Sequence, residues 1–286
     1  MSPLGWVGAA LVALLLILAL LGDAVSGYRY DAQDVQHALE GPTAAHLAGT
    51  DELGRDLLAR VAEGARISLL VALGATLLAL AVGVGYGGIS GYIGGRMDSW
   101  LMRGVDVVYS LPDILIIVLL TEVLQALLTG IPDLYRRVLA LGLALGLVGW
   151  VSVARLVRGL VLQAREEAWV EAARATGVRN RRLLLRYILP SISGPILVTA
   201  TFRIPAAILA ESTVSFLGLG IQPPFASWGV LASNGFAAMR SYPHLILFPS
   251  LAILVTLLAF HLLGEAVREA LDPRGRDQVA RRQDPV

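Results

Sequence analysis

The chain has 286 residues, of which 56% are hydrophobic and only 16% are charged, and its net charge at neutral pH is +1. Soluble domains average about 25% charged residues, so the composition argues against a soluble enzyme and gives no reason to expect nucleic-acid binding. The sequence contains no cysteine and no lysine. Thiol chemistry, disulfides and the nucleotide-binding loop whose lysine holds phosphates are therefore excluded on this chain.

Six apolar stretches predict six membrane-spanning helices, since a bilayer core is crossed by roughly 20 apolar residues in helical form. The stretches are residues 2–22, 67–95, 100–120, 138–154, 195–219 and 241–264. Helices are expected because every backbone polar group in lipid needs an internal partner, and no short alternating segments typical of a barrel occur. The sequence therefore predicts an all-α, polytopic membrane protein.

The first stretch, residues 1–22, is open to two interpretations. A secretory signal peptide would carry a basic residue before its apolar run and a small-residue cleavage site after it. No Lys or Arg precedes this run, and no clean Ala-x-Ala site follows it. We therefore expect an uncleaved first transmembrane helix, followed by an extracytoplasmic segment over residues 23–66.

The basic residues, all of them arginine, predict the orientation, because cytoplasmic loops are enriched in Lys and Arg. With both termini inside, fifteen arginines fall on the cytoplasmic side, seven on the outer side and Arg203 within the membrane. This orientation predicts a core of five further transmembrane helices over residues 67–265. That core contains a cytoplasmic loop over 158–190 and is followed by a cytoplasmic tail over 266–286.

Two patterns outside the loop concern helix packing. Four glycines recur every four residues on one face of the second span, namely Gly83, Gly87, Gly91 and Gly95. Small residues at this spacing let helix backbones approach closely in lipid. Just before that span, four apolar residues share a helical face: Leu53, Leu57, Leu58 and Val61. This segment is interpreted either as a cap packed on the second helix or as a surface helix that contacts a binding protein.

The cytoplasmic loop carries the most specific local pattern. Good helix formers run from Glu171 to Thr176, and Gly177 can end a helix in the left-handed conformation. Arginines follow over 179–182, and Pro190 marks the entry to the next span. Local spacing leaves two interpretations open: a short helix that docks a soluble partner, or an ordinary basic loop whose arginines only fix the topology.

The same loop resembles the EAA motif of ATP-binding-cassette (ABC) importer permeases. The residues that match this motif are Glu171, Ala172, Ala173, Gly177, Leu189 and Pro190. Tyr187 stands where many members have isoleucine, with Ile188 beside it, which is similar to the peptide and nickel branch. Further blocks resemble the same branch over residues 49–56, 64–69, 210–220, 222–229 and 271–274. The resemblance is to the C-type permease of dipeptide, oligopeptide and nickel importers.

That resemblance implies a type I ABC importer permease fold and a set of partners. The chain would pair with a second, unlike permease subunit and with two ABC ATPase subunits that carry ATP and Mg. An extracytoplasmic solute-binding protein would deliver the cargo. The implied location is the cytoplasmic (inner) membrane of a bacterium or archaeon. The implied cargo is a di- or oligopeptide, with nickel, glutathione or another small solute as alternatives.

The resemblance also implies roles for individual residues. Coupling to an ATPase subunit is expected from Glu171, Ala172, Ala173, Gly177, Ile188, Leu189 and Pro190. Charged residues inside a span are expensive in lipid and are therefore candidates for function; the candidates for a gate or path are Glu211, Asp106 and Asp113. No catalytic, cofactor or metal site is expected on this chain, and His244 and His261 lie in the sixth span without a companion ligand.

Two rival interpretations remain. A permease for another solute class, such as amino acids or phosphate, disagrees with the blocks downstream of the loop. An ATP-independent transporter or channel would need no docking loop and would show inverted repeats with broken helices, and neither is seen in the sequence. A catalytic enzyme is the weakest rival, since no nucleophile–base constellation occurs.

Overall fold

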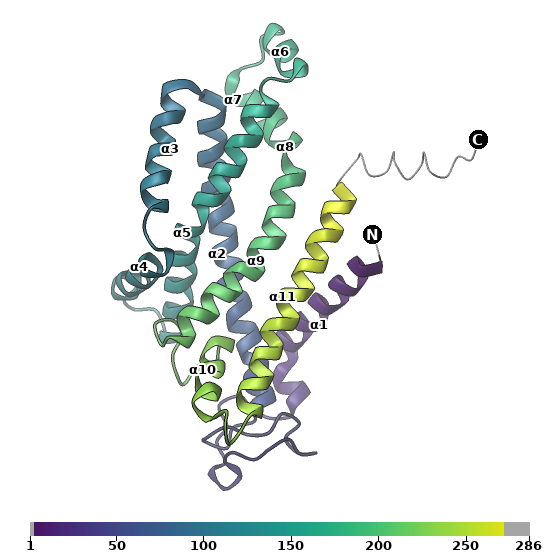
Figure 1. The fold of residues 1–286 in the computed structure, drawn as a ribbon, viewed down its shortest axis with the longest axis vertical. Helices are drawn as coiled ribbons and strands as arrows, with labels where there is room; N and C mark the ends of the chain where they lie inside the picture. The colour runs from purple at the N-terminus through teal and green to yellow at the C-terminus, as the bar shows by residue number, and fades with distance from the viewer. Residues whose placement is uncertain (1–2, 272–286) are drawn as a thin grey trace, which may run out of the picture.

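The computed structural model describes residues 3–271, and helices make up its regular structure (Figure 1). The long helices are α1 (Pro3–Ser26), α2 (Leu57–Ile93), α3 (Gly95–Tyr109), α4 (Asp113–Leu127), α5 (Asp133–Ala164), α9 (Ser193–Phe216), α10 (Trp228–Ala238) and α11 (His244–Leu271). Shorter elements are the 3-10 helix Val35–His37, α6 (Ala168–Ala175), α7 (Asn180–Leu183), the π-helical turn Leu184–Ile188 and α8 (Leu189–Ser191). The predicted all-α fold is confirmed for the described residues.

Five helices of the described chain are long and apolar enough to cross a membrane, namely α1, α2, α5, α9 and α11. The expected third crossing, residues 100–120, is not one straight helix: α3 and α4 meet at a bend of 87°. Pro112 explains the break, because proline lacks an amide hydrogen and disfavours a helical conformation in the residue before it. The total reaches the expected six crossings only if this bent pair counts as one.

Several helices are longer than the apolar stretches that revealed them. α2 begins at Leu57, where the carboxylate of Asp56 accepts a hydrogen bond from the Ala59 amide at 2.7 Å and caps the helix. Two residues of the apolar face, Leu57 and Val61, thus lie in the first turns of α2 and are buried. They therefore belong to the second helix itself and do not form a separate element packed on it. At its far end α11 continues to Leu271, and the predicted tail beyond it lies outside the described residues.

The glycine face of α2 packs directly on the backbone of α5. A Cβ built on Gly87 would lie 2.3 Å from the carbonyl oxygen of Ala154, and one on Gly91 would lie 2.7 Å from that of Arg158. Real Cβ atoms do not approach so closely, so only glycine permits this separation of the helices. The predicted role of the glycine pattern in packing is confirmed at these positions. Gly95, by contrast, has a positive φ and begins α3.

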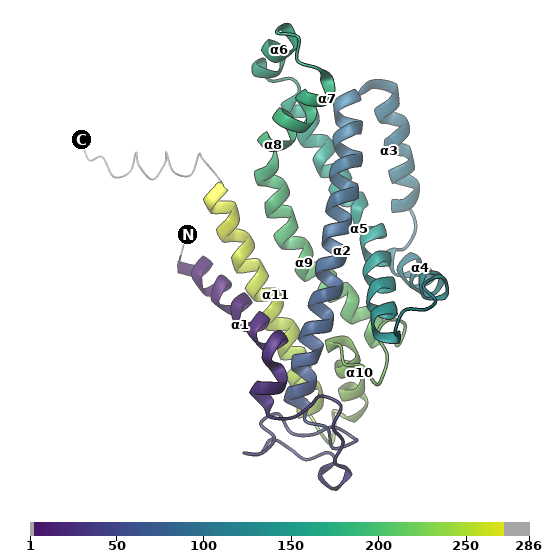
Figure 2. The same cartoon turned by 180° about the vertical axis from the view of Figure 1, so that it is seen from behind.

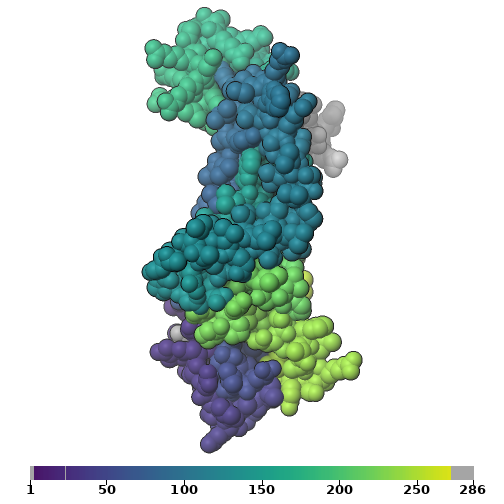
Figure 3. Space-filling view, turned by 90° about the vertical axis from the view of Figure 1, so that its left-hand side faces the viewer, coloured from purple at the N-terminus to yellow at the C-terminus, as the bar shows by residue number. Residues whose placement is uncertain are grey.

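The bundle has two dissimilar ends. One end carries α6, and the other carries the segment 27–56 together with α10 (Figure 1). We call these the α6 end and the α10 end. α1 begins and α11 ends toward the α6 end, as the view from behind also shows (Figure 2). In the space-filling view, α3 and α4 cover the middle of one side, with the α6 end above and the α10 end below (Figure 3).

Candidate functional site

The segment from Arg165 to Ile192, which we call the α6 loop, stands on an apolar base. Val170, Leu183 and Ile188 are fully buried and pack with valines on the last turns of α5. Because these three side chains come from α6, α7 and the π-helical turn, one small core fixes all three short elements to the end of α5. Tertiary burial thus replaces the stability that such short helices lack in isolation.

The backbone conformation of Gly177 ends α6. Its φ is +82°, its amide donates to the carbonyl of Arg174 at 2.9 Å, and the amide of Val178 donates to that of Ala173 at 3.1 Å. This pair of bonds is the Schellman motif, in which a left-handed residue satisfies the last carbonyls of a helix. The helix stop predicted at Gly177 is therefore confirmed.

Three contacts tie the α6 loop to the end of α2. The hydroxyl of Tyr92 donates to Asn180 Oδ1 at 2.8 Å, and the guanidinium of Arg174 lies over the Tyr92 ring. Arg165 Nη1 donates to the carbonyl of Gly91 at 3.3 Å. The loop is therefore held by both α2 and α5, so a displacement of α6 would be felt by the helices that pack along the glycine face.

The residues proposed for coupling fall into two groups in the structure. Glu171, Ala172, Gly177 and Pro190 are exposed, whereas Ala173, Ile188 and Leu189 are partly or fully buried in the base of the loop. An exposed carboxylate on a short, firmly seated helix can pair with a docked protein. The buried residues cannot contact a docked protein and can only fix the position of α6.

A basic hollow lies beside α6. It is lined by Arg179, Arg181, Arg182, Leu185 and Arg186. Within residues 3–271 none of these four guanidiniums makes an ion pair or hydrogen bond. In the sequence these arginines serve only to indicate the cytoplasmic side of the membrane. They line one hollow because the chain turns between α7 and α8.

Glu211 is the centre of a buried polar cluster in the half of the bundle near the α10 end. Its carboxylate is fully buried and accepts hydrogen bonds from Ser68 Oγ at 2.7 Å and from Ser215 Oγ at 2.8 Å. Ser215 Oγ in turn accepts from the Ile221 amide, and the indole of Trp228 donates to the carbonyl of Val61 at 2.9 Å. These contacts join α2, α9 and α10, so they support a role for Glu211 in packing.

The two aspartates proposed for a path lie in different places. Asp106 is exposed and accepts a hydrogen bond from Arg155 Nη2 at 2.7 Å, which links α3 to α5. Asp113 is the exposed first residue of α4 at the bend. The structure therefore does not bring Glu211, Asp106 and Asp113 into one site.

Sequence reasoning missed a further link at the α6 end. Asp98 in the first turn of α3 accepts from Arg158 Nε at 2.6 Å and from Ser90 Oγ at 2.6 Å. This nearly buried carboxylate ties α2, α3 and α5 together just below the α6 loop. The available signal was an acidic residue at a helix start, where the helix dipole favours it.

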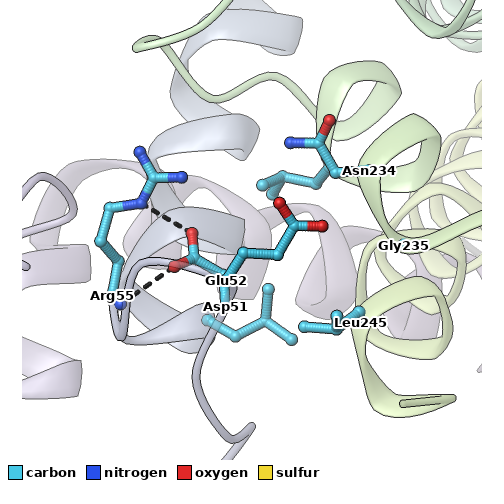
Figure 4. A pocket seen from close by; sticks show the side chains of 8 residues that line it. Asp51, Glu52, Arg55, Asn234, Gly235 and Leu245 are labelled. Carbon is cyan, nitrogen blue, oxygen red and sulfur yellow. Dashed lines mark hydrogen bonds and ion pairs between the residues drawn. The ribbon is translucent and has the colours of Figure 1, made fainter. Parts of the chain in front are cut away.

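The α10 end holds a second group of charges. Asp51 accepts from Arg55 Nε at 2.7 Å and lies 3.3 Å from Nε of the buried Arg60. A small hollow beside them is lined by Asp51, Glu52, Arg55, Leu57, Leu231, Asn234, Gly235 and Leu245. Figure 4 shows the Glu52 carboxylate extending toward Asn234 of α10, while Arg55 turns to Asp51.

A third hollow opens near the α6 end between α5, α9 and α11. Its lining residues are Leu156, Ser191, Gly194, Pro195, Val198, Thr199, Arg268 and Leu271. Among residues 3–271 there is no group of three or more His, Asp or Glu side chains that could hold a metal ion. His261 instead bonds the Leu257 carbonyl at 2.9 Å.

Sequence comparison relates the chain to known transport proteins. Residues 83–277 match the family model described as binding-protein-dependent transport system inner membrane component. The chain is 38% identical to the Bacillus subtilis oligopeptide transport system permease protein OppC, over 96% of this chain and 87% of that protein.

Two further relatives give the same picture. The Bacillus subtilis dipeptide transport system permease protein DppC is 41% identical, over 96% of this chain and 83% of that protein. The Escherichia coli OppC protein is 39% identical, over 94% of this chain and 87% of that protein. Because both the model match and the relatives span most of the sequence, the chain belongs to the family of inner membrane components of binding-protein-dependent ABC transport systems.

Proposed function

We propose that this chain is the C-type permease subunit of an ATP-driven peptide importer, and that α6 is its coupling helix. The observation that carries the proposal is the exposure of Glu171 on a helix whose other face is buried on α5. The names of the relatives, oligopeptide and dipeptide permeases, support a peptide cargo.

The proposed assembly supplies what this chain lacks. A second, unlike permease completes the translocation path, two ABC ATPase subunits bind ATP and Mg, and an extracytoplasmic binding protein delivers peptide at the α10 end. The α6 end then faces the cytoplasm together with both termini. The excess of arginines on that side supports this orientation.

Coupling follows from the way the loop is seated. When ATP draws the two ATPase subunits together, a groove that holds α6 moves, and ATP can shift the permease only because it binds the two states with different affinity. α6 passes the movement to α5 through Val170 and to α2 through Arg174 and Tyr92. Asp98 and Arg158 carry it on to α3.

The experiment compares Glu171→Ala with Glu269→Ala in the assembled importer. Both changes remove an exposed carboxylate at the α6 end, but Glu269 lies on α11, away from the loop. A lost charge-assisted hydrogen bond is worth about 1.5–3 kcal/mol, so Glu171→Ala should lower peptide uptake about tenfold or more. Glu269→Ala should leave uptake unchanged. Full uptake and peptide-stimulated ATPase activity in both Glu171→Ala and Gly177→Pro would remove the coupling assignment.

A further inference from the structure

An unpaired cation lies inside the bundle. Arg203 is in α9, ten residues from its first residue and therefore about 15 Å along the helix from the α6 end. Its side chain is half-buried, its Nη1 donates to Ser152 Oγ of α5 at 2.7 Å, and its Nε is buried without a hydrogen-bond partner. Among residues 3–271 no carboxylate forms an ion pair with it.

α5 is shaped to receive this guanidinium. A Cβ built on Gly149 would lie 2.0 Å from Arg203 Nη2, so the guanidinium in this position lies directly against the glycine, and a larger residue would push it aside. Gly149 and Ser152 are three residues apart and therefore lie on the same face of α5. Together they form a notch that holds the arginine against α5 and leaves Nη2 without a hydrogen-bond partner in the described chain.

The notch lies one helical turn from the hollow between α5, α9 and α11. Leu156 and Thr199 line the hollow. Ser152 lies four residues before Leu156 and Arg203 four residues after Thr199, and both lie farther from the α6 end. Residues four apart share a helix face and differ by about 6 Å along its axis. Arg203 therefore stands one turn beyond the wall of a hollow that opens at the α6 end.

A buried or membrane-embedded cation that lacks a counter-charge is costly and needs an anion. The guanidinium group matches a carboxylate in shape and can hold it by charge-assisted hydrogen bonds. We propose that Arg203 binds the carboxylate of the transported cargo as it passes between α5 and α9, so that the importer favours carboxylate-bearing cargo. This inference rests on the proposed importer function.

The test uses trialanine and trialanine amide, two peptides that differ only in the terminal carboxylate. Uptake of each is measured in proteoliposomes that hold the complete importer and its binding protein, with and without ATP. Each variant is compared with the wild type for the same peptide, so that any preference of the binding protein cancels. The variants are Arg203→Gln and Arg203→Lys, with Arg103→Gln as a matched control on α3, on the other side of the bundle.

We expect Arg203→Gln to lower trialanine uptake about tenfold while uptake of the amide changes little, since one charge-assisted hydrogen bond is lost. Trialanine uptake by Arg203→Lys should lie between that of the wild type and that of Arg203→Gln. Arg103→Gln should change the uptake of neither peptide. If Arg203→Gln does not assemble, Arg203→Lys and Ser152→Ala decide the question, because both leave the charge and disturb only its placement.

Two results overturn the inference. An equal loss for both peptides assigns Arg203 to a carboxylate of the partner permease or to a lipid phosphate, and no loss for either peptide leaves it without a ligand. Failure of the proposed function looks different: the wild-type importer then shows no ATP-dependent uptake of either peptide.

Discussion

The two ends of the bundle treat charge in opposite ways. At the α10 end, several polar side chains are buried and bonded within the chain, as in Asp51 with Arg55 and Asp56 with His46, although the guanidinium nitrogens of the buried Arg60 have no hydrogen-bond partner in the described residues. At the α6 end, Glu171 and the arginines that line the basic hollow are exposed and have no such pairing in the described chain.

The backbone repeats the contrast. Gly54 and Gly177 both have positive φ, yet a Cβ on Gly54 would lie 1.7 Å from the carbonyl oxygen of Asp34, whereas one on Gly177 would meet nothing within 4 Å. The α10 end is thus tightly folded on itself, and the α6 end is open around its helix stop. This difference supports the proposal that the α6 end docks another protein.

The largest effect is expected from the polar cluster near the α10 end. Glu211→Ala removes the acceptor of two buried hydroxyls, and each unsatisfied buried group costs about 1–3 kcal/mol. Thermal unfolding of the purified permease in detergent should show a large loss of stability. Glu211→Gln keeps an acceptor and should lose less. Equal stability of all three proteins would contradict the view that this end is held by internal pairing.

A second comparison sets the two left-handed glycines against each other. Any side chain at φ near +70° costs about 1–2 kcal/mol, and Gly54→Ala adds a clash with backbone, for which overpacking costs a further 1–3 kcal/mol. Gly54→Ala should therefore lower the unfolding temperature clearly more than Gly177→Ala. Gly177→Asn should lie close to the wild type, because asparagine tolerates this conformation. A larger effect at Gly177 would reverse the comparison.

The smallest effect concerns an exposed pair at the α10 end. A hydrogen bond to Asp34 raises the pKa of His37 above 6.5, and the same bond lowers the pKa of Asp34 below 3.8. The pair therefore stabilises the segment fully between those two values. Its contribution is lost as pH falls through the Asp34 pKa or rises through the His37 pKa.

Nuclear magnetic resonance of labelled histidine in nanodiscs measures this directly. Asp34→Asn should return the His37 pKa toward its ordinary value, whereas Asp31→Asn, whose carboxylate pairs with Arg29, should not. An unchanged His37 titration in Asp34→Asn would show that the pair does not form in solution.

Local features were predictable because their physics is local. A run of apolar residues marks α1 or α11 wherever it occurs, and Gly177 ends α6 through its own backbone conformation. The bend before α4 could not be predicted from hydropathy, although the stretch contains Pro112, because the apolar run continues across the bend. Hydropathy indicates which residues enter lipid, but it does not predict the direction that the backbone takes.

The sequence by itself determined the solvent, the helical fold class and the family, since composition, apolar runs and ordered motifs are properties of neighbouring residues. Only the tertiary structure placed Ser68 on Glu211, 143 residues away, and set the guanidinium of Arg203 in the notch of α5. These placements depend on how far α2, α5 and α9 approach one another. That approach is the sum of many side-chain contacts, and no short stretch of sequence contains it.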